Sequence, residues 1–329
     1  MAGLLIVGLI LGIAVHPASA GADRAVTLYL DWSIDGIHAP FFVALNKGWY
    51  TESGLSVDIR PGQGSSDAVK VVGAGRAQFG FADAATMVKG VASGAPVKML
   101  AVVIRKTPAV FLCNKNLRIR GIADLKGRSI GDAPQTATAT LLPAVLEANG
   151  LTMAQVRFVA MSFAARVPSV REGKIDCALG YLQEFVNVLD QFDVLPYHAM
   201  GINSYSSGIL VNTRYLRGNV ETVRRFVEVS LRGLQWALSH RQEAANITAG
   251  YTKDPGATRA YFAAELDVLA AYFTDDEVLR RGLGWMSEAR WRTTQELMVK
   301  YGGQRARVPL SQLYTTEFLP PKPFLPPKP

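Results

Sequence analysis

The first residues that could do chemistry follow an apolar run, 25–31, that is typical of a strand. Trp32 comes directly after this run, where its indole either stacks on a flat ligand ring or belongs to the core. His38 either donates a hydrogen bond to a ligand or caps the helix that follows. Phe41 and Phe42 point to different sides of that helix, and Phe42 is the better candidate for the core. We therefore predict ligand contacts from Trp32, His38 and Phe41.

A second group of candidate residues lies in the glycine-rich turn 61–66, which ends in a helix N-cap signal. Gly64, Ser65 and Ser66 offer free N–H groups and hydroxyls at a helix start. These groups suit a carboxylate, a sulfonate or a ring acceptor. The alternative is that a serine simply caps the helix. We predict that this turn contributes at least one ligand contact.

The elements that position these residues alternate between strands and short helices. Strands are expected over 54–59, 78–82, 97–104 and 109–113, with helices near 67–74 and 84–92. Asp83 follows one of these strands, and it either faces the cleft or caps the next helix; we favour the cap. The alternation predicts an α/β domain with a largely parallel sheet.

The same alternation restarts after residues 124–127, and the chain becomes mostly helical after Asn212. Two α/β units with a helical return predict a bilobal α/β protein with a central ligand cleft at strand ends and helix starts. We expect lobe 1 to span 21–114 and 212–318, and lobe 2, inserted in it, to span 115–211. The proline-rich tail 319–329 is expected to be disordered.

The first twenty residues have the pattern of a secretory signal peptide: an apolar run, 4–15, and small residues at 18–20. The mature protein is then expected to be soluble and periplasmic. The formal net charge is +8, but Lys and Arg are scattered singly, so we expect no nucleic-acid partner. We also expect a monomer.

The cysteines and histidines show no metal-ligand spacing, so no metal and no cofactor is predicted. Cys113 and Cys177 each lie in an apolar run. Export permits a disulfide between them, and two separate buried thiols are equally consistent with the sequence. The chain contains no nucleophile elbow and no P-loop, so no catalytic residue is predicted.

Several short motifs, in order, resemble the nitrate/taurine/thiamine-precursor class of ABC transporter substrate-binding proteins, and most of all its thiamine-pyrimidine branch. They are Asp31-Trp32-Ser33, His38-Ala39-Pro40-Phe41-Phe42-Val43-Ala44, Lys47-Gly48-Trp49-Tyr50, Gly54-Leu55-Ser56-Val57, Gly62-Gln63-Gly64-Ser65-Ser66, Gln78-Phe79-Gly80-Phe81-Ala82-Asp83, Asp124-Leu125-Lys126-Gly127 and Gly173-Lys174-Ile175-Asp176. Each motif is weak alone, but their order and spacing from about residue 26 to 319 are specific. The resemblance implies a type II periplasmic-binding fold that closes by hinge motion.

The resemblance also implies ligand contacts in the second lobe. Gln135, Thr136 and Thr138 lie at the strand-to-helix turn after Asp132. By analogy with the family, this turn touches the ligand. Tyr205, which precedes the last predicted strand, is a further candidate residue for the wall of the ligand cleft.

Tyr181 and Glu184 lie where the pyrimidine-precursor binders present an acid to an aminopyrimidine. A carboxylate accepts paired, charge-assisted hydrogen bonds from a ring N–H and an exocyclic amine. The alternative for Glu184 is a solvated acid in the first turn of a helix. We predict that both residues contact the ligand.

The resemblance implies a small-molecule receptor that delivers its ligand to an ABC permease and its ATPase. A small planar nitrogen heterocycle, such as a thiamine pyrimidine precursor, is the expected ligand. An alkanesulfonate, nitrate or an aromatic carboxylate is the alternative, and a sensory role is also consistent with the sequence. Some members of the wider branch are pyrimidine-forming enzymes with a cysteine-rich iron motif. This chain has only two cysteines, well separated. We therefore expect that this protein is not an enzyme.

Overall fold

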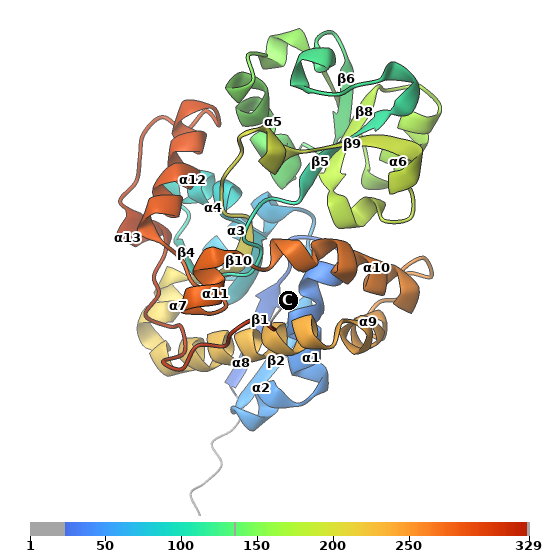
Figure 1. Cartoon of the computed structure of the whole chain (residues 1–329). Coiled ribbons are helices and arrows are strands. Elements are labelled where there is room, and N and C mark those ends of the chain that lie inside the picture. Colours follow the sequence, from blue (N-terminus) through green and yellow to red (C-terminus); the bar gives the residue numbers. More distant parts are fainter. Residues whose placement is uncertain (1–23, 135, 328–329) are drawn as a thin grey trace, which may run out of the picture.

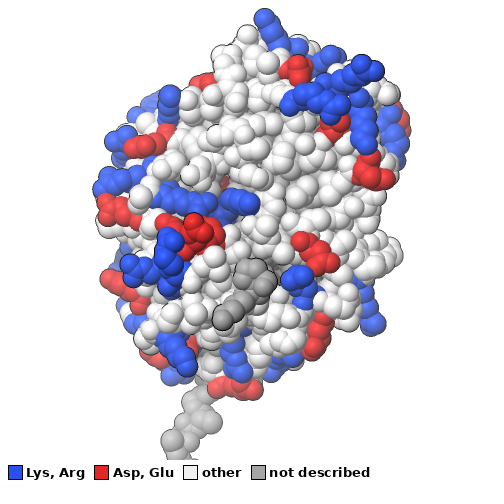
Figure 2. All heavy atoms as spheres, in the orientation of Figure 1, with Lys and Arg blue, Asp and Glu red and all other residues white. Residues whose placement is uncertain are grey.

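The computed structural model describes residues 24–134 and 136–327, which form two lobes, one above the other in Figure 1. The predicted signal segment and Gln135 lie outside the described residues. Among the described residues, no helix is long and apolar enough to cross a membrane. On the face drawn in Figure 2, basic side chains are interspersed with acidic ones.

Lobe 1 is built on a five-stranded sheet in the order β2-β1-β3-β10-β4. Strands β1, β2 and β3 are parallel, and β10 runs antiparallel to its two neighbours. The strands are β1 (Arg24–Tyr29), β2 (Leu55–Arg60), β3 (Phe79–Asp83), β4 (Val97–Val102) and β10 (Ser207–Asn212).

Eleven α-helices accompany this sheet among the described residues, and the long, amphipathic α8 buries one side against α1 and the sheet. Phe226 of α8 stacks on Phe79 of β3 with ring centroids 3.8 Å apart. The helices are α1 (Ala39–Asn46), α2 (Trp49–Glu52), α3 (Ser65–Gly73), α4 (Ala84–Ala92), α7 (Thr213–Gly218), α8 (Val220–Ser239), α9 (Arg241–Ala249), α10 (Arg259–Leu269), α11 (Asp276–Arg281), α12 (Glu288–Lys300) and α13 (Leu310–Leu313).

Lobe 2 repeats the same plan with the strand order β7-β6-β8-β5-β9. Here β6, β7 and β8 are parallel, and β5 runs antiparallel to its two neighbours. The elements are β5 (Ala109–Asn114), β6 (Ser129–Asp132), α5 (Ala137–Ala148), β7 (Arg157–Ala160), α6 (Phe163–Arg171), β8 (Cys177–Tyr181) and β9 (Phe192–Pro196). Cys113 of β5 and Cys177 of β8 are directly opposite in register and form a disulfide.

The predicted lobe boundaries need correction. β5 pairs with β8 and β9, so it belongs to lobe 2, while β10 pairs with β3 and β4, so it belongs to lobe 1. The two crossings therefore lie at 103–108 and 197–206, earlier than the expected lobe boundaries at 114/115 and 211/212. An apolar run predicts that a strand exists, but its partner is decided by contacts far away in the sequence.

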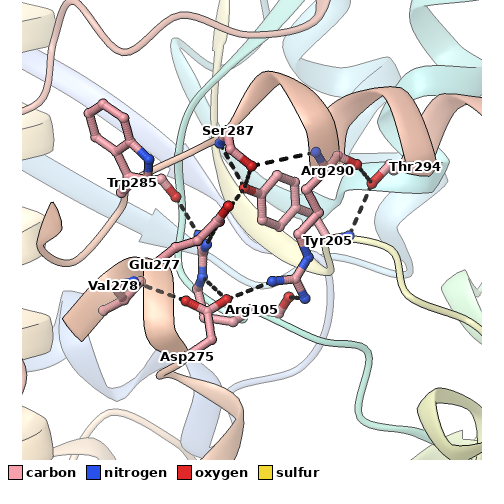
Figure 3. A network of polar contacts seen from close by, with 9 residues as sticks. All are labelled: Arg105, Tyr205, Asp275, Glu277, Val278, Trp285, Ser287, Arg290 and Thr294. Atoms are coloured by element: carbon pink, nitrogen blue, oxygen red, sulfur yellow. Dashed lines mark hydrogen bonds and ion pairs between the residues drawn. The ribbon is translucent and has the colours of Figure 1, made fainter. Parts of the chain in front are cut away.

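Both crossing segments are anchored to the C-terminal helices (Figure 3). Arg105 of the first crossing is 1% exposed and donates to Asp275 at 2.9 Å and Glu277 at 2.8 Å. Tyr205 of the second crossing donates its hydroxyl to Glu277 at 3.1 Å. Arg290 of α12 donates to Asp275 at 2.6 Å. The two connections between the lobes thus share one polar network.

The tail was expected to be disordered, and this is wrong for its described part, 319–327. The carbonyl of Phe324 accepts a hydrogen bond from the Leu283 N–H at 2.8 Å, and Gln235 donates to the Leu325 carbonyl at 2.8 Å. Leu319 and Phe324 also pack on the core. An extended proline-rich segment needs no hydrogen bonds within itself, so its carbonyls are free to accept from the body.

Candidate functional site

A cavity lies between the two lobes, at the carboxyl ends of β1, β6 and β8, as the sequence predicted for the cleft. Its empty space, with the mouth included, is about 480 Å³. Lobe 1 contributes Asp31, Trp32, Asp35, Ile37, Gly64 and Ser65. Lobe 2 contributes Asp132, Ala133, Thr136, Ala137, Thr138, Phe163, Arg166, Tyr181 and Glu184.

One aromatic ring from each lobe walls the cavity. Trp32, just after β1, and Phe163, the first residue of α6, have ring centroids 5.6 Å apart and planes tilted by 47°. The guanidinium of Arg166 lies over the Phe163 ring, 4.1 Å from its centroid. The two rings contact each other across the interlobe space, and each also lines the cavity.

The lobe 1 wall carries a buried acid–histidine–acid cluster. His38 Nε2 is 2.9 Å from Asp31 Oδ1, and its Nδ1 is 3.0 Å from Asp35 Oδ1. Burial alone would lower the pKa of His38, but the carboxylates of Asp35 and Asp31 outweigh it and raise that pKa to about 10. His38 is therefore a buried cation behind two carboxylates that line the cavity.

The lobe 2 wall has the same composition with an arginine as its cation. Arg166 is 2% exposed, with Nη1 3.2 Å from Asp132 Oδ1 and Nη2 2.8 Å from Glu184 Oε2. Thr136 and Thr138 donate their hydroxyls to Asp132. Burial raises the pKa of Glu184 to about 7 although Arg166 opposes it, and burial also raises that of Asp132. In the described residues, no group of three or more His, Cys, Asp and Glu side chains is arranged to hold a metal ion.

Local backbone features place these side chains. Gly64 caps α3 with φ of +128°, a conformation that side chains with a Cβ rarely adopt. A Cβ on Gly180 would lie 2.5 Å from Glu184 Oε2, so glycine there leaves room for the carboxylate. That carboxylate also accepts from the Tyr181 N–H at 3.1 Å.

The lobes also touch through a polar contact beside the cavity. Gln183, in the short 3₁₀ helix Leu182–Phe185, donates to Asp35 Oδ2 at 3.3 Å. That short helix also packs against α10 of lobe 1. This bond and the Trp32–Phe163 contact join the two lobes beside the cavity.

Seven of the predicted site residues lie around this one cavity, and their contact with a ligand stays a prediction. They are Trp32, Gly64, Ser65, Thr136, Thr138, Tyr181 and Glu184. Thr136 also caps α5 by accepting from the Ala139 N–H at 3.1 Å. Ser65 Oγ accepts from the Asp83 N–H at 3.1 Å and lies 3.4 Å from Asp31 Oδ2.

Five predicted residues lie away from the cavity walls. His38 is behind Asp31 and Asp35, as described above, and Ser66 faces a different surface hollow. Phe41 belongs to the core, because its ring packs edge-on against Phe81 at 5.4 Å, so its predicted ligand contact is wrong. Phe42 is a core residue, as expected.

Asp83 accepts from the Thr86 N–H at 3.1 Å and thus caps α4, the interpretation that we favoured. Tyr205 is fully buried in the network of Figure 3 and is not a cavity wall. A tyrosine before a strand looks the same in sequence whether its hydroxyl meets a ligand or a neighbouring acid such as Glu277.

The sequence interpretation missed eight cavity residues, of which five are charged or aromatic: Asp31, Asp35, Asp132, Phe163 and Arg166. A signal was present for Asp31 and Asp132, because each stands at the end of a predicted strand, where the cleft was expected. Arg166 lies in α6. Nothing in the helix pattern distinguishes an arginine that turns inward from a solvated one.

The same architecture occurs in solved structures of other proteins. A protein from Bordetella bronchiseptica RB50 matches with a TM-score of 0.72 and 20% identity, over 91% of this chain and 96% of that one. The periplasmic aliphatic sulphonate binding protein SsuA from Escherichia coli matches with a TM-score of 0.69 and 16% identity, over 88% and 96%. These likenesses confirm the bilobal periplasmic-binding fold.

Residues 36–244 match the family model described as NMT1/THI5 like, and the chain belongs to this family. The riboflavin-binding protein RibY of Chloroflexus aurantiacus is 27% identical over 93% of this chain and 91% of its own. The formylaminopyrimidine-binding protein of Halalkalibacterium halodurans is 24% identical over 69% and 70%.

A relative of another kind is the 4-amino-5-hydroxymethyl-2-methylpyrimidine phosphate synthase THI13 of Saccharomyces cerevisiae, 22% identical over 65% and 67%. The expected kinship with thiamine-precursor proteins is thus confirmed.

Proposed function

We propose that this protein is the extracytoplasmic receptor of an ABC importer and that it captures a small planar nitrogen heterocycle by closing its two lobes. The observation that carries the proposal is the composition of the interlobe cavity. Trp32 and Phe163 offer aromatic surface from opposite lobes, and carboxyl groups surround them. Flat rings that bear N–H groups match both features, because carboxylates accept hydrogen bonds and aromatic faces stack.

The two named binding relatives support this ligand class. A flavin and an aminopyrimidine are both planar nitrogen heterocycles, so RibY and the formylaminopyrimidine-binding protein share the chemistry that we propose. We therefore include both ligand types in the test. The pyrimidine of a thiamine precursor remains the first candidate, with Glu184 as its hydrogen-bond acceptor.

An alkanesulfonate or nitrate fits the cavity less well. Such an anion needs a cation in the site, and Arg166 is the one basic residue among the described lining residues. Asp132 and Glu184 already pair with its guanidinium. An anion would have to displace these carboxylates and remain near Asp31 and Asp35, which carry a like charge.

Transport rather than catalysis is the role that we propose. The binding relatives align over more of this chain than the synthase does, and the predicted export signal supports a location outside the cytoplasm. The cavity residues form two acid–cation clusters, which suit the binding of a ring that donates hydrogen bonds.

Isothermal titration calorimetry against a ligand panel tests this proposal. The panel contains an aminopyrimidine thiamine precursor, formylaminopyrimidine, riboflavin, an alkanesulfonate and nitrate. We expect a heterocycle to bind and the Trp32→Ala and Glu184→Gln variants to bind it at least about tenfold more weakly. Trp236→Ala, on α8 away from the cavity, is the matched control. Heat from the anions alone, or unchanged affinity in both cavity variants, would refute the proposal.

A further inference from the structure

The two walls of the cavity contain the same numbers of acidic and basic groups. Each holds two carboxyl groups and one cation: Asp31, Asp35 and His38 in lobe 1, and Asp132, Glu184 and Arg166 in lobe 2. When the four carboxyl groups are ionised, each wall therefore keeps a net negative charge. Closing the lobes brings these two like-charged walls together around the ligand.

The neighbouring titratable groups offer no further cation. Asp83 and Glu265 are fully buried close to the lobe 1 cluster, and ionisation of either would add negative charge. The hydroxyls of Tyr181, Tyr197 and Tyr261 are further titratable groups near the clusters, and none of them is a cation. Within the described lining residues, Arg166 is the one Lys or Arg side chain.

Tyr181 also lines the cavity and is 7% exposed. Its buried hydroxyl lies near the hydroxyls of Ser206 and Ser207, which are neutral, so it adds no charge to either wall. The face of Trp32 adds a surface that attracts cations through the ring quadrupole.

We infer that the cleft selects a heterocycle that carries a positive charge, such as an aminopyrimidinium ion, over its neutral counterpart. This inference rests on the proposed function and narrows its ligand class. A cationic ring between the walls neutralises the charge that opposes closure, and it donates N–H groups to carboxylates on both sides. A neutral ring supplies the stacking but leaves the repulsion between the walls.

The charge of the ligand then governs the pH dependence of binding. Burial raises the pKa of Asp31, Asp132 and Glu184, that of Glu184 to about 7. A cation binds best when these groups are ionised, so its affinity rises with pH through their raised pKa values and then levels off. Binding of the cation below that plateau also releases protons from the carboxyl groups.

The experiment compares two probes by titration calorimetry at pH 8 in low salt. One is an N-methylated aminopyrimidinium ion, which is permanently cationic, and the other is the same aminopyrimidine without the methyl group, which is neutral at this pH. We expect the cation to bind about tenfold more tightly or better. Its affinity should fall as the pH is lowered to 5.5, with proton release visible in buffers of different ionisation enthalpy.

Charge variants test the source of this preference. Glu184→Gln removes the net charge of the lobe 2 wall, and Asp35→Asn does so for lobe 1. Either one should reduce the cation preference to about threefold or less. Glu172→Gln, an exposed carboxylate paired with Lys174, is the matched control and should keep the full preference.

Two outcomes overturn the inference, and they differ in what they say of the proposed function. Binding of the neutral probe as tightly as the cation refutes the charge selectivity while the heterocycle receptor stands. Failure of both probes, together with riboflavin and formylaminopyrimidine, refutes the receptor proposal as well.

Discussion

Replacing Arg105 with methionine should destabilise the protein strongly, because this guanidinium connects the crossing segment to the C-terminal helices. Removing one partner of a buried ion pair costs about 3–5 kcal/mol. Asp275 keeps Arg290 at 2.6 Å and the Val278 N–H at 3.0 Å, and Glu277 keeps the Tyr205 hydroxyl. The side chains of Asp275 and Glu277 are also 24% and 30% exposed, so water partly compensates them. We therefore expect the free energy of unfolding to fall by an amount at the lower end of this range, about 3 kcal/mol.

Equilibrium urea unfolding, followed by circular dichroism and tryptophan fluorescence, measures this cost. Arg292→Met is the matched control, because Arg292 and Glu288 form an ion pair in which both side chains are 61% exposed. That control should lose less than about 0.5 kcal/mol. If Arg105→Met loses no more free energy of unfolding than Arg292→Met, the network of Figure 3 does not stabilise the crossing segments and the reasoning is wrong.

Three further changes test other parts of the structure. Reducing the disulfide between Cys113 and Cys177, which are 64 residues apart, should lower the free energy of unfolding by about 4 kcal/mol, measured by urea unfolding with and without reductant. The His38→Asn variant should lose the most free energy of unfolding near pH 6. The raised pKa of His38, about 10, gives stability that is full below its ordinary pKa of 6.5 and is lost as the pH rises toward 10. Unfolding curves across this range should therefore converge, and a constant difference would contradict the buried cation. Gly180→Ala should weaken heterocycle binding in calorimetry, because its Cβ would lie 2.5 Å from Glu184 Oε2; unchanged affinity would contradict that role for Glu184.

Much of the fold follows from the sequence because its signals are local. Alternating apolar runs and glycine turns predicted strands and helices close to their observed bounds, and Asp83 and Thr136 lie at helix starts, as expected from their types. The partner of each strand could not be predicted in this way. As a result, β5 and β10 were assigned to the wrong lobes.

The candidate site was predicted in outline but not in its electrostatics. Strand ends indicated where the cleft lies, so Trp32 and Glu184 were found. The pairing of Arg166 with two acids, and of His38 with two others, depends on which way each side chain turns in the folded lobes. A sequence pattern does not contain that information, because helix and loop residues of either orientation have the same spacing.

Native mass spectrometry of the protein, exported and purified without refolding, tests the central claim most directly. The account predicts a bound small molecule whose mass and fragments identify a planar nitrogen heterocycle, and which is lost in Trp32→Ala and Glu184→Gln but retained in Trp236→Ala. A co-purified sulfonate or other anion that is retained in both cavity variants would contradict it.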